Sequence, residues 1–440
     1  MTRGFAATIV IGALLCTRVT AQAQPTREER PAPPQVAGRL LTMEEAVTIA
    51  LETQPQIQAR LADYAAARFR VDQAIAFLLP QLSASVSSSR RQTSSFVGAA
   101  PSPVASTRGF NETLDAHLAL SQLLFDFGKN FAATEAAKKL AAVALEDIEL
   151  QRQLIALAVK EAYTNILFAQ RLTRVNQQAV ERAELNLRSA RGFFEVGTRP
   201  RSDVARAEVD VANARVDLIR ARNLERLARV ALNTAMGIDL DTPTQVQDNL
   251  VYEPVALDRA EIRTEALRQR PEARQIRLQA EAAQASERQA FRDFFPDITG
   301  SGTYGGVRQE LDEVWTITLS MSWSLYDGGG RIARYREAKA NLEAARARVR
   351  ALELDIGREV EQSQITVEEA QERLQAAQTA VASAQENFRL AQGRFDAGVG
   401  TILELTDAQL ALTQAQNLEA QALADYRVAL YRLDRARGRR

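Results

Sequence analysis

Residues 315–325, in the stretch that ends at Tyr326, alternate strictly between apolar and small polar side chains. Apolar residues fill the odd positions from Trp315 to Leu325, and only threonine and serine fill the even positions between them. A period of two predicts a β-strand with one apolar and one hydroxyl-bearing face. Trp315 and Trp323 would lie about 26 Å apart on the apolar face. This separation suits a strand that crosses a membrane with one tryptophan near each interface. One strand of a soluble sandwich is the alternative interpretation.

Three further segments complete two predicted β-hairpins, in which 82–89 pairs with 114–125 and 298–304 pairs with 315–326. Leu114, Ala116 and Leu118 continue the apolar face, whereas Asp115 and His117 fall on the hydroxyl face. We interpret His117, the single histidine of the chain, as a water-facing polar residue and not as a catalytic residue or metal ligand.

A very long helix is predicted after each hairpin. Residues 130–195 contain no proline and a single glycine, Gly192, which allows a helix of about 100 Å. The second such helix carries apolar residues in alternating steps of four and three: Ala370, Leu374, Ala377, Val381, Ala384, Phe388, Ala391 and Phe395. This heptad spacing indicates coiled-coil packing. A free-standing coiled coil or tether would need no membrane-facing strands, so the hairpins argue against that alternative.

The chain is a tandem duplication. Thr42 and Glu45 form a predicted capping box at a helix start, and a similar pattern recurs 216 residues later, the same shift that relates Pro80 to Pro296. From 124–237 to 325–438 the shift is 201 residues without a gap. The difference, 216 − 201 = 15, falls in a longer loop of the first copy within 90–110. We expect a first repeat at 41–240, a linker at 241–256 and a second repeat at 257–438.

Residues 1–23 have the features of a secretory signal peptide: Arg3, a short apolar run, and the cleavage pattern Ala21-Gln22-Ala23. A proline-rich, extended leader is expected at 24–40. The only cysteine, Cys16, lies inside the signal, and acylation there is disfavoured because the bulky Leu15 precedes it. The mature chain is therefore expected to have no disulfide and no thiol chemistry.

The composition supplies little for catalysis. The formal net charge is zero, which gives no reason to expect nucleic acid as a partner. The sequence has no glycine-rich phosphate loop and no cluster of metal ligands, and its acids and bases are spread along helical faces. We therefore expect neither a cofactor nor enzyme activity.

Two turns join the long helices to the helices that follow them. The first turn contains Val196, Gly197 and Thr198, and the second contains Gly398, Val399, Gly400 and Thr401. Glycine suits the left-handed residue that ends a helix. Pro200 suits the first turn of the next helix, and Thr401 with Glu404 forms a second predicted capping box.

Taken together, the chain resembles the outer membrane efflux protein family, the TolC-like channels. The resemblance rests on the segments LTMEEAVTIALETQP, LLFDFG, SLYDGG, FFEVGTRPRSDVARAE and FDAGVGTILELTDAQ and on the doubled unit of hairpin and long helix. It implies a mostly helical α+β membrane protein with a TolC-like tandem repeat. Three chains would form a 12-stranded β-barrel in the outer membrane of a Gram-negative bacterium, continued by a periplasmic α-helical barrel.

The sequence by itself requires only more than one chain, because four strands cannot close a barrel and open sheet edges are not tolerated in lipid. Two chains would give eight strands and an interior that side chains nearly fill. The resemblance implies a homotrimer. It also implies a passive export duct of a tripartite efflux pump or a type I secretion system, powered by an inner-membrane partner of RND, ABC or MFS type. A periplasmic coiled-coil adaptor that bridges the two membranes is the alternative function.

The resemblance also assigns roles to the two turns. They would be the periplasmic tip at which the adaptor docks, and acidic residues matching Glu404 and Asp407 line the constriction of the family's channels. Asp203 matches the corresponding acid of the first copy. This chain departs from the family pattern at two places: Arg206 follows Asp203 by one helical turn, and Gly400 replaces a locking arginine. We therefore expect a charged constriction without an assigned lock.

Overall fold

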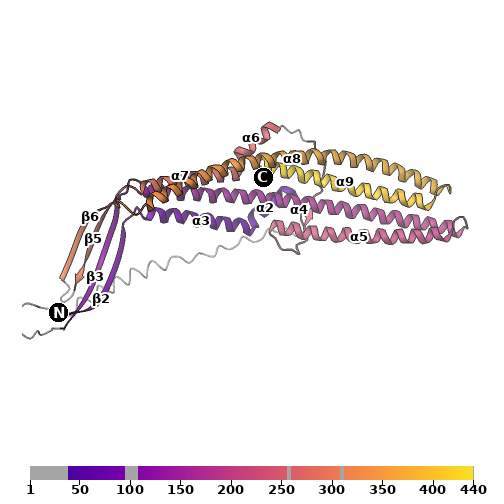
Figure 1. Cartoon of the computed structure of the whole chain (residues 1–440). Helices are drawn as coiled ribbons and strands as arrows, with labels where there is room; N and C mark the ends of the chain where they lie inside the picture. Colours follow the sequence, from indigo (N-terminus) through magenta and orange to yellow (C-terminus); the bar gives the residue numbers. More distant parts are fainter. Residues whose placement is uncertain (1–37, 95–107, 255–258, 308–311, 440) are drawn as a thin grey trace, which may run out of the picture.

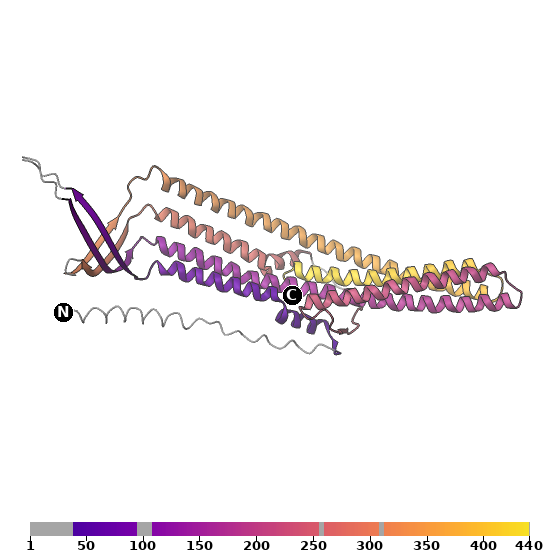
Figure 2. The same ribbon diagram turned by 90° about the horizontal axis from the view of Figure 1, so that it is seen from below.

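The computed structural model describes residues 38–94, 108–254, 259–307 and 312–439. The predicted signal peptide, nearly all of the leader at 24–40 and the centre of the long loop at 90–110 lie outside these ranges. The chain is elongated, with a β-sheet at one end and long helices that extend to the other end (Figure 1). Its C-terminus lies midway along the helices in both views (Figures 1 and 2).

The same order of elements occurs twice. The first set is α2 (Met43–Thr53), α3 (Pro55–Ala76), β2 (Gln81–Ser94), β3 (Arg108–Phe125), α4 (Lys129–Glu195) and α5 (Arg201–Met236). The second set is α6 (Arg259–Gln269), α7 (Pro271–Arg292), β5 (Asp297–Val307), β6 (Asp312–Ser322), α8 (Gly330–Asp396) and α9 (Ile402–Ala436). Both α4 and α8 have 67 residues, and both α3 and α7 have 22. The duplication of the sequence thus extends to the lengths of the helices.

The four long strands form one antiparallel sheet in the order β2-β3-β5-β6. Strand β6 ends at Ser322, so the prediction that it continues to residue 326 is wrong. The reason is the length of its partner, because β5 begins at Asp297, directly opposite Ser322. The guanidinium of Arg331 also bonds to the carbonyl of Ser324 and holds this segment against the helices.

The predicted alternation of faces is confirmed. On one face, hydroxyl groups bond across the strands, with 2.9 Å between Thr299 and Ser320 and 2.8 Å between Ser85 Oγ and His117 Nε2. His117 lies on this polar face. On the other face, Ile317 and Leu319 are 81% and 73% exposed. The apolar face of the sheet is therefore not buried by any described part of the chain.

The helices pack as two long hairpins, α4 with α5 and α8 with α9. The predicted seam of α8 is confirmed, because its members are buried or half-buried at every position from Ala370 to Phe395. The predicted capping box at α2 is confirmed by reciprocal hydrogen bonds of 3.1 and 3.3 Å between Thr42 and Glu45. None of the described helices combines the length and hydropathy needed to cross a membrane.

The main apolar core lies midway along the bundle, where the two sets of helices meet two short strands that were not predicted. These strands, β1 (Leu40–Leu41) and β4 (Gln245–Val246), pair in parallel. The Tyr163 hydroxyl is fully buried between them, 2.9 Å from the carbonyl of Leu41 and 2.8 Å from that of Gln247. Burial raises the pKa of Tyr163 to about 12, so this hydroxyl keeps its proton even at pH values where an exposed tyrosine ionises.

Four charged residues connect α7, α8 and α9 beside this core. The Arg270 side chain is only 4% exposed and lies 3.1 Å from Glu272 and 2.7 Å from Glu359. Arg435, near the end of α9, lies 3.2 and 3.3 Å from the same two carboxylates. Burial raises the pKa of Glu272, but hydrogen bonding and charge from Arg270 outweigh burial and hold that pKa below its usual value.

Candidate functional site at the helical tips

Both turns at the far end of the bundle end a long helix in the same way. Gly197 and Gly398 have φ values of 75° and 78°, in the left-handed region that favours glycine. In each turn the glycine N–H bonds to the carbonyl three residues earlier, and the next N–H bonds to the carbonyl five residues earlier, all at 3.0 Å. This is the Schellman arrangement, and it satisfies carbonyls that the helix leaves unpaired.

Gly400 is required for a different reason. It does not have a positive φ, but a Cβ atom at this position would lie 2.9 Å from the backbone nitrogen of Phe395. Its own N–H bonds to the carbonyl of Arg394 at 2.8 Å, which holds the turn tightly against the helix end. Any side chain at Gly400 would therefore force the second turn to open.

The predicted capping box after the second turn is only half formed. The Thr401 hydroxyl accepts a hydrogen bond from the Glu404 N–H at 3.2 Å, as predicted. The Glu404 carboxylate does not return to the Thr401 backbone, because it lies 3.6 Å from Nε of Arg394 instead. Glu404 thus pairs across the turn, on an exposed surface where such pairs contribute little to stability.

Arg199 joins the two turns, and the sequence analysis missed it. Its guanidinium donates to the carbonyl of Gly400 at 2.7 Å and lies over the ring of Phe395, 4.3 Å from the ring centroid. Its side chain is only 13% exposed. The shift of 201 residues between the copies makes Arg199 the counterpart of Gly400. Arg199 of the first copy therefore contacts the residue at the equivalent position of the second copy. No sequence signal identifies this contact, because it connects residues 201 positions apart.

The three predicted acids do not form one cluster within the chain. Asp203 lies 3.6 Å from Nη1 of Arg199 and is only 16% exposed. Glu404 faces Arg394, and Asp407 is exposed. Arg206 is exposed, so the partner of Asp203 is Arg199 and not the arginine singled out from the sequence. Within the described ranges, no group of three or more metal-ligating side chains lies close enough together to hold a metal ion.

The two tryptophans of the sheet have different surroundings. Trp315 is 65% exposed and pairs with Tyr304 across the apolar face. Trp323 lies just beyond β6, and its indole N–H donates to the carbonyl of Phe294 at 3.0 Å. In the first copy, the side-chain amide of Gln122 makes the equivalent bond to Leu78 at 2.9 Å. The Trp323 indole therefore also connects the end of the strand to the preceding helix.

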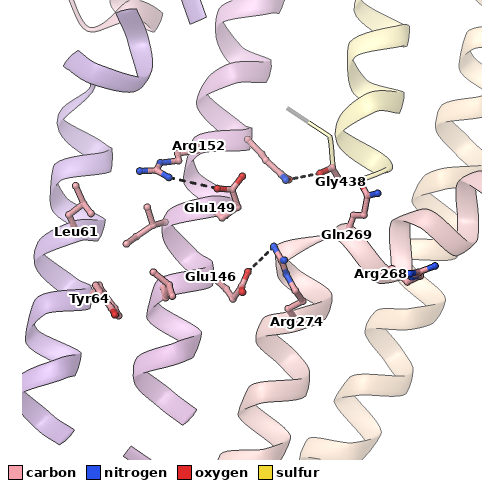
Figure 3. A pocket seen from close by; sticks show the side chains of 12 residues that line it. Leu61, Tyr64, Glu146, Glu149, Arg152, Arg268, Gln269, Arg274 and Gly438 are labelled. Carbon is pink, nitrogen blue, oxygen red and sulfur yellow. Dashed lines mark hydrogen bonds and ion pairs between the residues drawn. The ribbon is translucent and has the colours of Figure 1, made fainter. Parts of the chain in front are cut away.

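A cavity of about 630 Å³ lies midway along the bundle, between α3, α4, α6 and α7 (Figure 3). Its charged groups largely pair with one another: Arg274 lies 2.9 Å from Glu146, and Arg152 lies 3.9 Å from Glu149. The Gln153 amide donates to the carbonyl of Gly438 at 2.9 Å and fixes the end of the chain. The pair of Arg152 and Glu149 lies within α4, whereas the other two contacts join α4 to α7 and to the segment after α9.

Comparison with known proteins places these features in a family. The family model described as "Outer membrane efflux protein" matches residues 46–238 and 262–439. The chain is 26% identical over 412 residues to the alkaline protease secretion protein AprF of Pseudomonas aeruginosa, covering 88% of this chain and 82% of AprF.

Solved structures share the fold. A membrane protein from Pseudomonas aeruginosa has a TM-score of 0.80 at 22% identity, with 94% of this chain and 97% of that chain covered. The outer membrane protein VceC of Vibrio cholerae has a TM-score of 0.76 at 20% identity, with 90% and 96% covered. Because the family model matches both sets of helices over most of their length, the chain belongs to the outer membrane efflux protein family.

Proposed function

We propose that this chain is the passive export duct of a tripartite efflux pump or a type I secretion system. The observation that carries the proposal is the sheet, whose apolar face is exposed while hydroxyl groups bond across its other face. A soluble sheet would bury its apolar face, whereas a membrane strand presents that face to lipid. An adaptor has no use for such a sheet, so the same observation disfavours the alternative function.

The family places the sheet in the outer membrane and the helices in the periplasm. A helix of 67 residues is about 100 Å long at 1.5 Å per residue. This length allows the tips to reach far below the membrane, toward an inner-membrane partner. The relative AprF is named for the secretion of alkaline protease, which supports proteins as one class of cargo.

We propose a homotrimer. Strands β2 and β6 are the two edges of the four-stranded sheet and each has one unpaired side within the chain. Lipid does not tolerate unpaired backbone groups, so each edge strand requires a neighbouring chain. Three chains would supply 12 strands and a water-filled interior lined by the hydroxyl face, whereas eight strands would leave little space.

The tips are proposed as the docking site of a periplasmic adaptor, through Val196–Thr198 of the first turn and 398–401 of the second. Val196 and Val399 are 72% and 70% exposed at the end of the molecule, which leaves apolar side chains available for a partner. An inner-membrane pump would supply the energy. We propose no catalytic role for any residue of the chain.

The same tips are proposed to form a charged constriction. In a trimer, Glu404 and Asp407 would each form a ring of three carboxylates, which favours bound cations. Asp203 would contribute less to this field, because Arg199 lies beside it and both side chains are largely buried. Glu404 lies equally close to Arg394, but water screens that exposed pair.

Cell fractionation and site-specific crosslinking test the function. The full chain should form trimers in the outer-membrane fraction and conduct ions in planar bilayers. A photocrosslinking residue at Val399 should capture a periplasmic adaptor in intact cells, whereas the same residue at Val209, exposed on α5 away from the turn, should not. Recovery of the chain in the periplasm as a monomer would overturn the proposal.

A further inference from the structure

A second cavity, of about 340 Å³, lies where the first hairpin joins α4. It is lined by Leu78, Leu123, Leu124, Phe125, Asp126, Phe127, Gly128 and Phe131. The one charged group among them, the Asp126 carboxylate, is buried and accepts hydrogen bonds from the backbone of Gly128 at 2.9 Å and of Asn130 at 2.7 Å. The carboxylate is thus satisfied by its own chain, and the cavity walls are mainly hydrocarbon.

The cavity continues the apolar face of the sheet. A β-bulge at Leu124 interrupts the register between β3 and β5, because Leu123 pairs with Thr299 and Phe125 pairs with Ile298. Leu124 consequently lies over Gly300, whose neighbour on β6 is the exposed Leu319. Leu124 and Phe125 are 55% and 53% exposed. The bulge therefore turns two successive apolar side chains toward the same surface.

One wall of the cavity is maintained by an unfavourable backbone conformation. Phe127 has a φ of 53° and is the only described residue other than glycine with a positive φ. Its counterpart in the second copy is Gly328, with a φ of 69°. A left-handed conformation is unfavourable for a residue that carries a Cβ atom. The Phe127 ring packs against Phe125 at 4.7 Å and stacks on Phe295 at 5.1 Å, and it is still 40% exposed.

The cationic side chains beside the cavity bind oxygen atoms of the chain itself. Lys129 lies 2.5 Å from Asp297 and 3.7 Å from Asp293, and Arg292 donates to the carbonyl of Gly128 at 2.7 Å. Because these cations already have oxygen partners, the rim has no strong preference for an anionic ligand. Phe131, which lines the cavity, is 66% exposed. The cavity thus suits an uncharged, flexible hydrocarbon chain.

We propose that this cavity binds one acyl chain of a membrane phospholipid in each protomer, and that Phe127 keeps it open. The inference rests on the proposed location of the sheet in the outer membrane. It goes further by assigning a lipid site to the first copy, where Phe127 forms a wall that Gly328 cannot form in the second.

The test uses the full protein in lipid nanodiscs that contain a phosphatidylethanolamine with a diazirine on its acyl chain. After irradiation, mass spectrometry compares adducts on 123–131 with adducts on the equivalent 324–332. We expect severalfold more adduct on the first segment. Phe127→Gly should lose most of this excess although it relieves the backbone strain. Phe131→Gln should also lose it, whereas Ile332→Gln at the equivalent position of the second copy should not.

Three results would overturn the site. Equal labelling of the two segments would mean ordinary contact with lipid, unchanged labelling in Phe127→Gly would exclude its role, and crosslinks from 123–131 to a second copy would mean that a neighbouring protomer covers the cavity. Failure of the proposed function is distinguishable, because adducts would then be absent from the apolar face of β6 as well.

Discussion

The turn after α4 and the turn after α8 have the same Schellman backbone but differ in side chains at equivalent positions. Arg199 in the first copy occupies the position of Gly400 in the second, and its guanidinium donates to the carbonyl of that glycine. The same inequality occurs at the strand ends, with Phe127 opposite Gly328. A duplicated chain can therefore keep its backbone while matching positions of the two copies carry different side chains and make different contacts.

In the middle of the bundle, equivalent positions of the two copies differ in charge. The end of α2 and start of α3 carry Gln54 and Gln56, and the equivalent positions of the second copy, 216 residues later, carry Arg270 and Glu272. Gln54 donates to two carbonyls at the end of α5, at 2.8 and 2.6 Å, whereas Arg270 joins a network of four charges. The first copy is closed by neutral hydrogen bonds and the second by ion pairs, so their responses to mutation and pH should differ.

The largest effect is expected from Glu272→Ala. It removes one carboxylate from both Arg270, which is 4% exposed, and Arg435. Breaking a buried pair from one side costs about 3–5 kcal/mol of unfolding free energy. Denaturant unfolding of the detergent-solubilised protein measures this loss. The matched change Gln56→Ala, at the equivalent exposed position of the first copy, should stay within about 0.5 kcal/mol. Equal losses would remove the contrast between the copies.

Acid should weaken the second copy through the same carboxylates. The pKa of Glu272 is lowered in the folded protein, so its contribution to stability is present above the unfolded pKa, about 4.3. That contribution is lost as the pH falls through the lowered folded value. The wild-type protein should therefore lose more unfolding free energy on acidification below about pH 4.3 than Glu272→Ala does. Parallel pH profiles of the two proteins would contradict this role.

The next effect concerns the faces of β6. Leu319→Arg should cost about 2–4 kcal/mol per chain and reduce membrane insertion, because it places a charge in the lipid between Trp315 and Trp323. Ser320→Arg should be tolerated, since Ser320 lies on the hydroxyl face with Thr299. The amount of heat-resistant trimer in outer-membrane fractions compares the two variants. Similar yields would refute the face assignment.

Bulky residues in the two turns should differ in their effect on stability. Gly400→Leu forces contact with the backbone of Phe395, and opening of the turn would shift the Gly400 carbonyl to which Arg199 donates. Overpacking of this kind costs about 1–3 kcal/mol, and we expect export to stop while trimers still reach the membrane. A Cβ atom added at Gly197 meets no atom within 4 Å, so for Gly197→Leu the cost comes from the positive φ of the backbone. We expect this variant to lose export through disturbed adaptor docking alone. Normal export from both variants would contradict docking at the tips.

Arg199→Ala should have a smaller effect on stability and a specific effect on conductance. It removes the hydrogen bond to Gly400 and the contact with the Phe395 ring, which together contribute about 1–2 kcal/mol. Loss of this connection should let the two helical hairpins separate at the tip and raise the basal conductance in planar bilayers. Arg201→Ala, at an exposed position two residues later, is the control. If Arg199→Ala leaves the basal conductance unchanged, Arg199 contributes to packing of the turns and not to closure of the channel.

The smallest effect is expected from neutralising the exposed acids. Glu404→Gln combined with Asp407→Asn should weaken cation selectivity and block by polyvalent cations from the periplasmic side, with little change in stability. Bilayer reversal potentials measure the selectivity. Asp203→Asn should change selectivity less, because Arg199 already lies beside that carboxylate. Selectivity unchanged in the double variant would leave Glu404 and Asp407 without a role in permeation.

The sequence by itself determined the elements that depend on local periodicity. The alternation in β6 gave both faces of the sheet, the heptad seam of α8 gave its packing surface, and Thr42 gave the start of α2. These signals are local, because a strand repeats every two residues and a helix every 3.6. The sequence also predicted the duplication, since a repeat is a property of the sequence.

Only the tertiary structure decided the features that depend on distant partners. Strand β6 ends at Ser322 because β5 begins opposite it, and Glu404 leaves its predicted cap because Arg394 is near. Arg199 donates a hydrogen bond to Gly400, which lies 201 positions away in the sequence. The side chains of Phe127 and Arg270 likewise acquire their roles from neighbours on other elements. A one-dimensional pattern does not contain these contacts, because they arise only when separate elements of the chain pack against one another.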